Sequence, residues 1–121
     1  MSAKKLVQDF YKSDALINTE IMDSYLHPDV LLNWDSSTGF KQMKRRDLLS
    51  LSKELGKAYI RSKAKISHVM KDGDQVMVRY DHFIKTFENP REEMLLAHFM
   101  VIWEIRDDKL YRGYQMSQVP K

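Results

Sequence analysis

The sequence predicts a single α+β domain in which three helices precede an antiparallel sheet. Three apolar stripes with helical spacing occupy the first 60 residues. In the second half apolar residues recur at every second position, as in strands with one buried face, and turn signals separate these segments. The chain has 121 residues, of which 43% are hydrophobic, and this suffices for one core. We therefore expect one domain spanning residues 1–121.

The helical stripes place the three helices along the chain. The first helix is expected over about residues 3–13 and the third over about 44–58. Asn18 or Asp14 could cap the second helix, and His27-Pro28-Asp29 ends it. The apolar positions of the three stripes are Leu6, Val7, Phe10 and Tyr11, then Ile17, Ile21, Tyr25 and Leu26, then Leu48, Leu51, Leu55 and Tyr59.

Turn signals define the strands. Asp72-Gly73, Asn89-Pro90 and Asp107-Asp108 each lie between segments with strand periodicity, which predicts a meander of antiparallel strands. A short apolar strand at Val30–Trp34 precedes the turn-forming residues 35–39. The strands of the meander are expected at Ile66–Met70, Val76–Phe87, Met94–Arg106 and Leu110–Gln118.

The turns also predict which residues share a face of the sheet, because directly opposed residues point the same way. A two-residue turn at Asp107-Asp108 sets Trp103 opposite Arg112. A four-residue turn around Asn89-Pro90 sets His82 opposite Ala97. The face expected to meet the helices carries Val76, Val78, Tyr80, His82, Ile84, Leu95, Ala97, Phe99, Val101, Trp103, Ile105, Leu110, Arg112, Tyr114, Met116 and Gln118. A slip of one residue would reverse the faces.

The opposite face of the predicted sheet is unusually apolar for a solvated surface. A contiguous exposed block of this kind marks a protein interface, so we expect a homodimer formed through it. Asp81 and His98 fall opposite each other there and are expected to pair. The residues of this expected interface are Met77, Phe83, Leu96, His98, Met100 and Ile102. Scattered surface apolar residues are the alternative.

Charge and composition exclude several functions. The net charge is +3, but residues 41–65 hold nine basic and two acidic side chains, a net charge of +7. No aromatic residue alternates with these charges, so we expect a solvated face rather than a nucleic-acid site. There is no cysteine, the four histidines are not closely spaced, and no glycine-rich phosphate loop is present, so neither a metal nor a cofactor is expected. The N-terminal residues lack a signal-peptide core and no membrane-length apolar run occurs, which favours a cytoplasmic protein.

Several segments in this order resemble the NTF2-like proteins, which include SnoaL-like and ketosteroid-isomerase-like members. The resemblance spans about residues 4–118, and residue 108 is Asp where the family usually has Gly. The segments that carry it are Tyr25-Leu26-His27-Pro28-Asp29-Val30, Trp34-Asp35-Ser36-Ser37-Thr38-Gly39, Lys71-Asp72-Gly73-Asp74-Gln75-Val76-Met77-Val78-Arg79 and Ile102-Trp103-Glu104-Ile105-Arg106-Asp107-Asp108-Lys109-Leu110.

The resemblance implies a cystatin-like fold, in which a cone-shaped curved antiparallel sheet wraps around a helix and encloses an apolar pocket. It also implies a homodimer packed through the outer sheet faces, in agreement with the argument from the two faces. Members of this family include isomerases, dehydratases, hydrolases and cyclases, while others only bind ligands or proteins. Fold alone therefore does not settle the function.

Two side chains are candidates for proton transfer. Asp35 resembles the position of a catalytic carboxylate in ketosteroid-isomerase-like members, although Asp before Ser-Ser-Thr-Gly is also an ordinary turn residue. His82 on the inward face is a candidate general base, and a buried histidine bonded to Tyr80 is the structural alternative. We expect His82 to be neutral, because a charge in an apolar pocket is costly. The other expected pocket residues are Trp34, Tyr59, Tyr80, Phe99, Trp103, Arg112, Tyr114 and Met116.

The sequence leaves two functions open. In the first, the cone binds a small apolar or aromatic molecule and could turn it over by isomerisation or dehydration, with Tyr80 or Tyr114 polarising the substrate oxygen. In the second, the chain is a non-catalytic dimeric interaction module whose pocket is filled by its own side chains. A cavity of roughly 300 Å³ or more with convergent polar groups would favour the first function.

Overall fold

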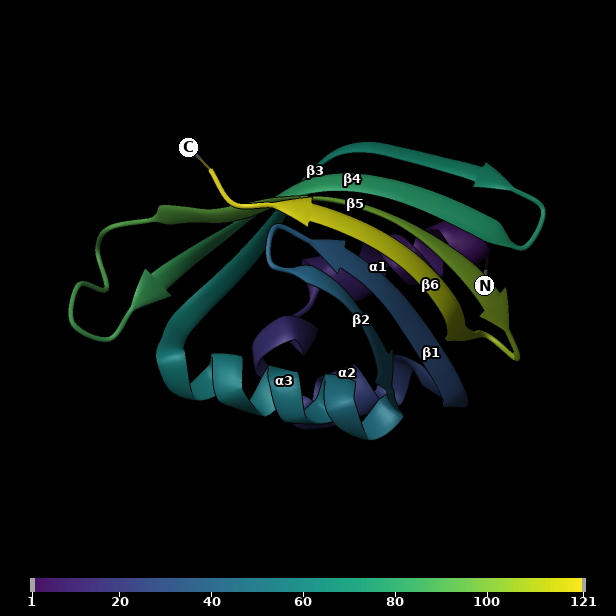
Figure 1. Cartoon of the computed structure of the whole chain (residues 1–121), viewed down its shortest axis with the longest axis horizontal. Coiled ribbons are helices and arrows are strands. Elements are labelled where there is room, and N and C mark those ends of the chain that lie inside the picture. The colour runs from purple at the N-terminus through teal and green to yellow at the C-terminus, as the bar shows by residue number, and fades with distance from the viewer. Residues whose placement is uncertain (1, 121) are drawn as a thin grey trace.

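The computed structural model describes residues 2–120 and follows the predicted order of helices and strands (Figure 1). Between residues 2 and 120, no helix occurs after Ala58, as the sequence predicts. None of the helices in that range is long and apolar enough to cross a membrane. The elements are α1 (Ala3–Lys12), the 3-10 turn η1 (Ala15–Ile17), α2 (Thr19–Tyr25), β1 (Leu26–Ser36), β2 (Gly39–Lys44), α3 (Arg45–Ala58), β3 (Tyr59–Asp72), β4 (Gln75–Thr86), β5 (Met94–Arg106) and β6 (Lys109–Gln118).

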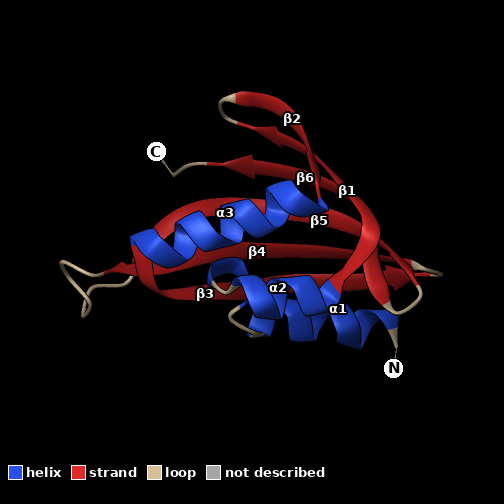
Figure 2. Cartoon of the chain, turned by 90° about the horizontal axis from the view of Figure 1, so that it is seen from below, coloured by secondary structure: helices blue, strands red, loops and turns tan. Residues whose placement is uncertain are grey.

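Six strands form one curved sheet that arches over the helices, and the helices lie on one face of it (Figures 1 and 2). The strand order is β2-β1-β6-β5-β4-β3. Strands β1 and β6 pair in parallel, so the sheet is mixed rather than antiparallel as predicted. The turn signals could reveal only hairpins, which are antiparallel, whereas the pairing of β1 with β6 joins segments that no turn connects.

Strand β2 was not predicted, and β1 is longer than expected. The two strands form a hairpin closed by residues 37 and 38, with Ser36 opposite Gly39. Gly39 has φ +118°, a conformation that favours glycine. Of the β2 residues only Met43 is buried, because β2 lies at the sheet edge, and so the segment lacks the alternation that signals a strand.

The helix caps follow from local sequence. The Ser2 hydroxyl accepts a hydrogen bond from the Lys5 amide at the start of α1. Asn18, rather than Asp14, caps α2 by accepting a bond from the Ile21 amide. Asp47 accepts a bond from the Lys44 amide at the start of α3.

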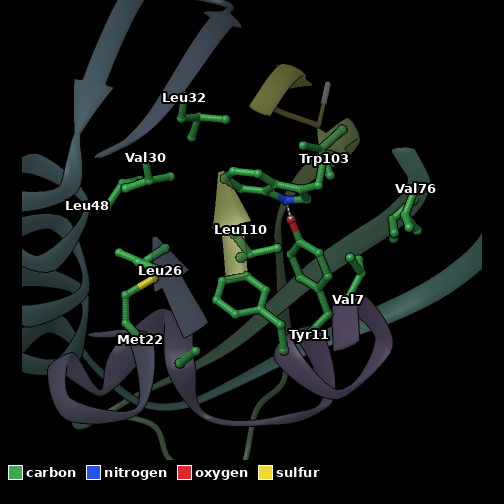
Figure 3. Packing of buried hydrophobic residues seen from close by; sticks show 14 of the residues in the cluster. Val7, Tyr11, Met22, Leu26, Val30, Leu32, Leu48, Val76, Trp103 and Leu110 are labelled. Carbon is green, nitrogen blue, oxygen red and sulfur yellow. Dashed lines mark hydrogen bonds between the residues drawn. The ribbon is translucent and has the colours of Figure 1, made fainter. Parts of the chain in front are cut away.

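The core lies between the helices and the inner sheet face, and the Trp103 indole is part of it (Figure 3). The indole Nε1 donates a hydrogen bond of 2.8 Å to the hydroxyl of Tyr11 on α1, so one bond joins the helix layer to the middle of the sheet. Val7, Val76 and Leu110 are fully buried around this pair.

A bulge in β6 changes the register that the turn alone predicts. Asp107 and Asp108 form the predicted two-residue turn, both with positive φ, and Ile105 lies opposite Leu110 as expected. Beyond the turn, Glu104 pairs with Arg112, so Tyr111 is the extra residue. Trp103 therefore lies opposite Gly113 instead of Arg112.

The bulge has a packing cause. A Cβ atom on residue 113 would lie 2.7 Å from the Trp103 ring and 2.6 Å from Leu32 Cδ1, so no larger residue fits beneath the indole. The displaced Tyr111 ring packs outside the ladder between two guanidinium groups, 4.2 Å from that of Arg106 and 3.9 Å from that of Arg112.

The register between β4 and β5 agrees with the sequence over its central part. His82 opposes Ala97, Tyr80 opposes Phe99 and Asp81 opposes His98, as predicted. Beyond His82 a second irregularity shifts the pairing of β4 with β5 by one residue, so Ile84 opposes Met94 instead of Leu95.

We expect Gly113→Ala to destabilise the fold by about 1–3 kcal/mol, because the added methyl overpacks the contact with Trp103 and Leu32. Urea unfolding followed by circular dichroism measures this change. Gln118→Ala, an exposed change in the same strand, is the control and should stay within about 0.5 kcal/mol. A neutral or stabilising Gly113→Ala would contradict the register and the packing described above.

Candidate functional site

A cavity of about 70 Å³ lies between the inner sheet face and the helices, where the sequence predicts a pocket. Of the predicted site residues it is lined by His82, Trp34, Tyr80, Phe99 and Trp103. Tyr59, Asp35, Arg112, Tyr114 and Met116 do not line it. The remaining lining residues are Phe10, Tyr11, Leu16, Met22, Leu26, Leu32, Leu48, Leu51, Leu55 and Gln115.

The lining contains no aspartate, glutamate, lysine or arginine. His82 is its one imidazole and is 3% exposed. Burial lowers the pKa of His82 to about 4, because the charged ring would lose its hydration. The ring is therefore neutral at pH 7, as the sequence argument expects, and the wall of the cavity carries no formal charge.

His82 is bonded to Ser62 rather than to Tyr80. The Ser62 hydroxyl on β3 lies 2.7 Å from His82 Nε2. Among residues 2–120, no second partner engages the ring, which leaves Nδ1 unpaired. Every fully enclosed side-chain nitrogen or oxygen in this part of the chain has a partner, so Nδ1 must border open space, and the space beside His82 is the cavity.

Gln115 is a polar cavity residue that the sequence analysis missed. It is 7% exposed, and within residues 2–120 its amide makes no side-chain hydrogen bond. By the same reasoning as for His82, the amide borders open space. The predicted register placed Gln115 on the outer face, and the bulge at Tyr111 turns it inward. The sequence does hold a signal of this inward turn, which is Gly113 two residues before Gln115. A glycine inside a strand often marks a bulge or a close approach of two chain segments.

Three polar groups gather beside the cavity at Tyr11, Tyr80 and Trp103. Burial raises the pKa of both tyrosines well above the usual value. Trp103 supplies the proton of the bond to Tyr11, and a bond between the two tyrosine hydroxyls would use only one of their two protons. One tyrosine O–H therefore remains for another acceptor.

Trp34 forms the wall of the cavity next to the sheet edge. Its Nε1 donates a bond of 2.8 Å to the Ser117 hydroxyl, and its ring centroid lies 6.1 Å from that of Phe99. The ammonium of Lys41 lies 5.1 Å from the centroid of the Trp34 ring. These contacts fix the orientation of a side chain that is itself only half-buried.

Five predicted site residues lie away from the cavity. Asp35 is exposed on the outer face, because it follows the inward-facing Trp34 in β1. Tyr59 is half-buried where α3 meets β3. The predictions for Arg112, Tyr114 and Met116 are wrong for one reason, since the bulge turns all three to the outer face. Tyr114 is 49% and Met116 67% exposed.

The outer face is more apolar than predicted because it gains Tyr114 and Met116. Met77 opposes Ile102, Met100 opposes Met116 and Ile102 opposes Tyr114. Asp81 and His98 form the predicted pair, with 2.7 Å between Asp81 Oδ1 and His98 Nδ1. We call Met77, Met100, Ile102, Tyr114 and Met116 the outer patch; with Asn33, Asp35, Val101 and Gln115 they line a hollow of about 290 Å³.

A second outer hollow, of about 610 Å³, lies where the ends of β1 and β6 meet β5. It is open and shallow in form, and Arg79 and His98 are its basic groups. Each has a protein partner already, Ser67 for Arg79 and Asp81 for His98.

No family model matches the chain, and no curated protein does. Solved structures do match. IdmH, a putative polyketide cyclase from Streptomyces antibioticus, superposes with a TM-score of 0.76 at 12% identity, over 97% of this chain and 92% of that one. A putative SnoaL-like polyketide cyclase from Shewanella denitrificans OS-217 has a TM-score of 0.72 at 10% identity, covering 95% and 89% of the two chains.

An LEH-like epoxide hydrolase from M. tuberculosis is a third similar structure, with a TM-score of 0.71 at 17% identity over 95% of this chain and 81% of that chain. At such low identities these matches define the fold and leave the activity open. Together with the six-stranded curved sheet over three helices, they show that this chain has the α+β cone fold of the NTF2-like proteins.

Proposed function

We propose that the chain binds a small neutral molecule inside the cone. The observation that carries this proposal is that two polar groups of the cavity lining, His82 Nδ1 and the Gln115 amide, each lack a partner within the described residues. Both side chains are more than nine-tenths buried, and among the described residues neither group has a hydrogen-bond partner. Since no fully enclosed polar atom in this part of the chain lacks a partner, these two groups border open space, where they are free to bond a ligand or water. Aromatic walls with a few polar groups are typical of ligand sites.

The protons on His82 favour a ligand oxygen as the partner of Nδ1. The described residues offer the Ser62 hydroxyl no acceptor except His82 Nε2, so donation to Nε2 satisfies its proton. In the neutral ring Nδ1 then carries the hydrogen and donates it. A carbonyl or hydroxyl oxygen accepts such a bond, and the free tyrosine O–H offers a second donor of the same kind.

The same arrangement supports binding ahead of catalysis. Isomerisation or dehydration by proton transfer needs an acceptor facing the ligand, and the favoured tautomer of His82 presents a donor. The pKa of about 4 also makes the ring a weak base at neutral pH. Asp35 cannot replace it, because the carboxylate is on the outer face.

A dimeric interaction module is the second candidate. A cavity of about 70 Å³ is well below the roughly 300 Å³ of ordinary ligand sites, which supports a pocket filled largely by its own side chains. The outer patch supports the dimer. Its members Met100, Ile102, Tyr114 and Met116 are each at least 40% exposed and are contiguous on the sheet. We propose that a second copy of the chain covers this patch, with the expected interface residues Phe83, Leu96 and His98 beside it.

Phenol is a suitable probe of the cone, because it is neutral and combines one ring with one oxygen. We expect it to change the fluorescence of Trp103 and Trp34, which line the cavity. Gln115→Leu and His82→Phe should each weaken binding about three- to tenfold, the value of one hydrogen bond. Gln118→Leu, on the exposed face of β6, is the matched control and should bind as the unchanged chain does. A filled-pocket module would show no saturable change with phenol.

Acid should destabilise the fold through His82. The folded-state pKa of about 4 is below the ordinary value of 6.5, so between these pH values the unfolded chain binds the extra proton. Stability should therefore fall as the pH drops from about 6.5 to 4, by up to about 3 kcal/mol. His82→Gln should remove that part of the slope, whereas His68→Gln, an exposed change, should leave it. Identical slopes for the two variants would show that His82 is not buried as described.

The dimer is tested by Met100→Lys, which puts a charge in the outer patch and should convert dimers into monomers. Sedimentation velocity at micromolar concentration measures the change. Ile60→Lys is the control, because Ile60 is 48% exposed and its neighbours on β3 pair with Thr86 and Lys85 rather than with the patch. A monomeric unchanged chain at that concentration would contradict the proposed interface.

A further inference from the structure

Helix α3 has two contact stripes that serve different neighbours. Leu48, Leu51 and Leu55 line the cavity and form its roof. Ser52 and Gly56 lie on the next stripe and face the turn η1. The distance between α3 and η1 and the position of the roof are therefore linked through one rigid helix.

The contact with η1 is as close as the backbone permits. Ser52 is fully buried, and its hydroxyl donates a bond of 2.7 Å to the Ala15 carbonyl. At Gly56 an added Cβ would lie 2.4 Å from the Ile17 carbonyl oxygen, so the helix approaches the turn where only glycine fits. Leu16, between these two carbonyl residues, also lines the cavity. The contact thus holds both the roof and part of the wall.

The cavity that results is small. At about 10–15 Å³ of accessible space per water-sized group, a volume of about 70 Å³ holds about five to seven non-hydrogen atoms. A single ring with one oxygen is at this limit, and a fused bicyclic molecule exceeds it. The wall carries no formal charge, which excludes ionic ligands of the same size unless they bring a counter-charge.

We infer that the contact of Ser52 and Gly56 with η1 is the specificity-determining feature of the cone, and that it limits the ligand to a neutral molecule of one ring or smaller. This inference rests on the proposed ligand-binding function. Ser52 and Gly56 act through the position of α3 and do not touch the ligand, so they are positioning residues. Their effect should be visible as a change in size selectivity.

The test compares the affinities of phenol and 1-naphthol by tryptophan fluorescence. We expect the unchanged chain to bind phenol at least about tenfold more tightly than 1-naphthol, because a ligand too large for a fixed pocket loses about this much affinity. In Gly56→Ala the added methyl must move α3 from η1 by about 1 Å to reach an ordinary contact distance. That variant should lose most of the preference. Leu55→Ala removes roof volume while leaving Ser52 and Gly56 unchanged, and it should also admit 1-naphthol.

Gly73→Ala is the matched control. Gly73 has φ +60° and no neighbour near an added Cβ, so the substitution strains a remote turn without moving α3. It should lower stability and leave the phenol to 1-naphthol ratio unchanged, which separates selectivity from a general loss of stability.

The outcomes are distinct. Equal affinity of the unchanged chain for both probes overturns the size limit. Suppose that Leu55→Ala loses the preference for phenol while Gly56→Ala folds and keeps it. That result overturns the role of the η1 contact. If Gly56→Ala does not fold, Ser52→Ala, which removes the bond to Ala15 without adding bulk, replaces it and should shift the ratio in the same direction. If no variant binds either probe while all remain folded, the proposed function itself fails.

Discussion

The packing of the Trp103 indole over Gly113 is the constraint on which most of the structure depends. The ring occupies the space that any side chain at residue 113 would need, and its nitrogen binds Tyr11 on the opposite layer. For Gly113 to lie under the ring, β6 must contain one residue more than the turn geometry requires, and Tyr111 is that residue. Every side chain beyond it in β6 is assigned to a face by this bulge. The place of Gln115 in the cavity lining and of Tyr114 and Met116 in the outer patch both follow.

The sequence predicts local features of this fold well. The periodicity of α1 and α3 and the turn at Asp107-Asp108 depend on neighbouring residues, and the structure confirms them. It also confirms the pairing of His82 with Ala97, which depends on one turn and an unbroken stretch of strand. These features require no knowledge of what packs across the core.

The features that the sequence did not reveal depend on distant residues. The bulge at Tyr111 is explained by the close contact of Gly113 with Trp103, across the hairpin, and with Leu32, which belongs to β1 and is far from Tyr111 in the sequence. Gln115 is a cavity residue only because of that bulge. The parallel pairing of β1 with β6 and the edge strand β2 leave no periodic trace, because the first has no connecting turn and the second has only one buried side chain. The alternative in which His82 bonds to Tyr80 is wrong, because Ser62 on edge strand β3 reaches the ring instead.

The charges of the chain are separated from its cavity. The basic residues of positions 41–65 are divided among β2, α3 and β3, and most are exposed. Lys63 and Lys65 project from edge strand β3, where lysine opposes the addition of a foreign strand. The lining around His82 has no such charge. The molecule thus combines a basic surface with an interior suited to neutral groups.

The place of β6 in the sheet also bears on how the chain folds. This strand is the last in sequence, yet it lies between β1 and β5 near the middle of the sheet. Until it is available, the hairpin of β1 and β2 has no partner strand on its inner edge, and Trp103 has no surface beneath its ring. Joining β1 to β6 closes a loop of about eighty residues, and contacts of such long range slow folding because their entropic cost precedes their gain. Strand β6 is therefore the element that joins the hairpin of β1 and β2 to the rest of the sheet.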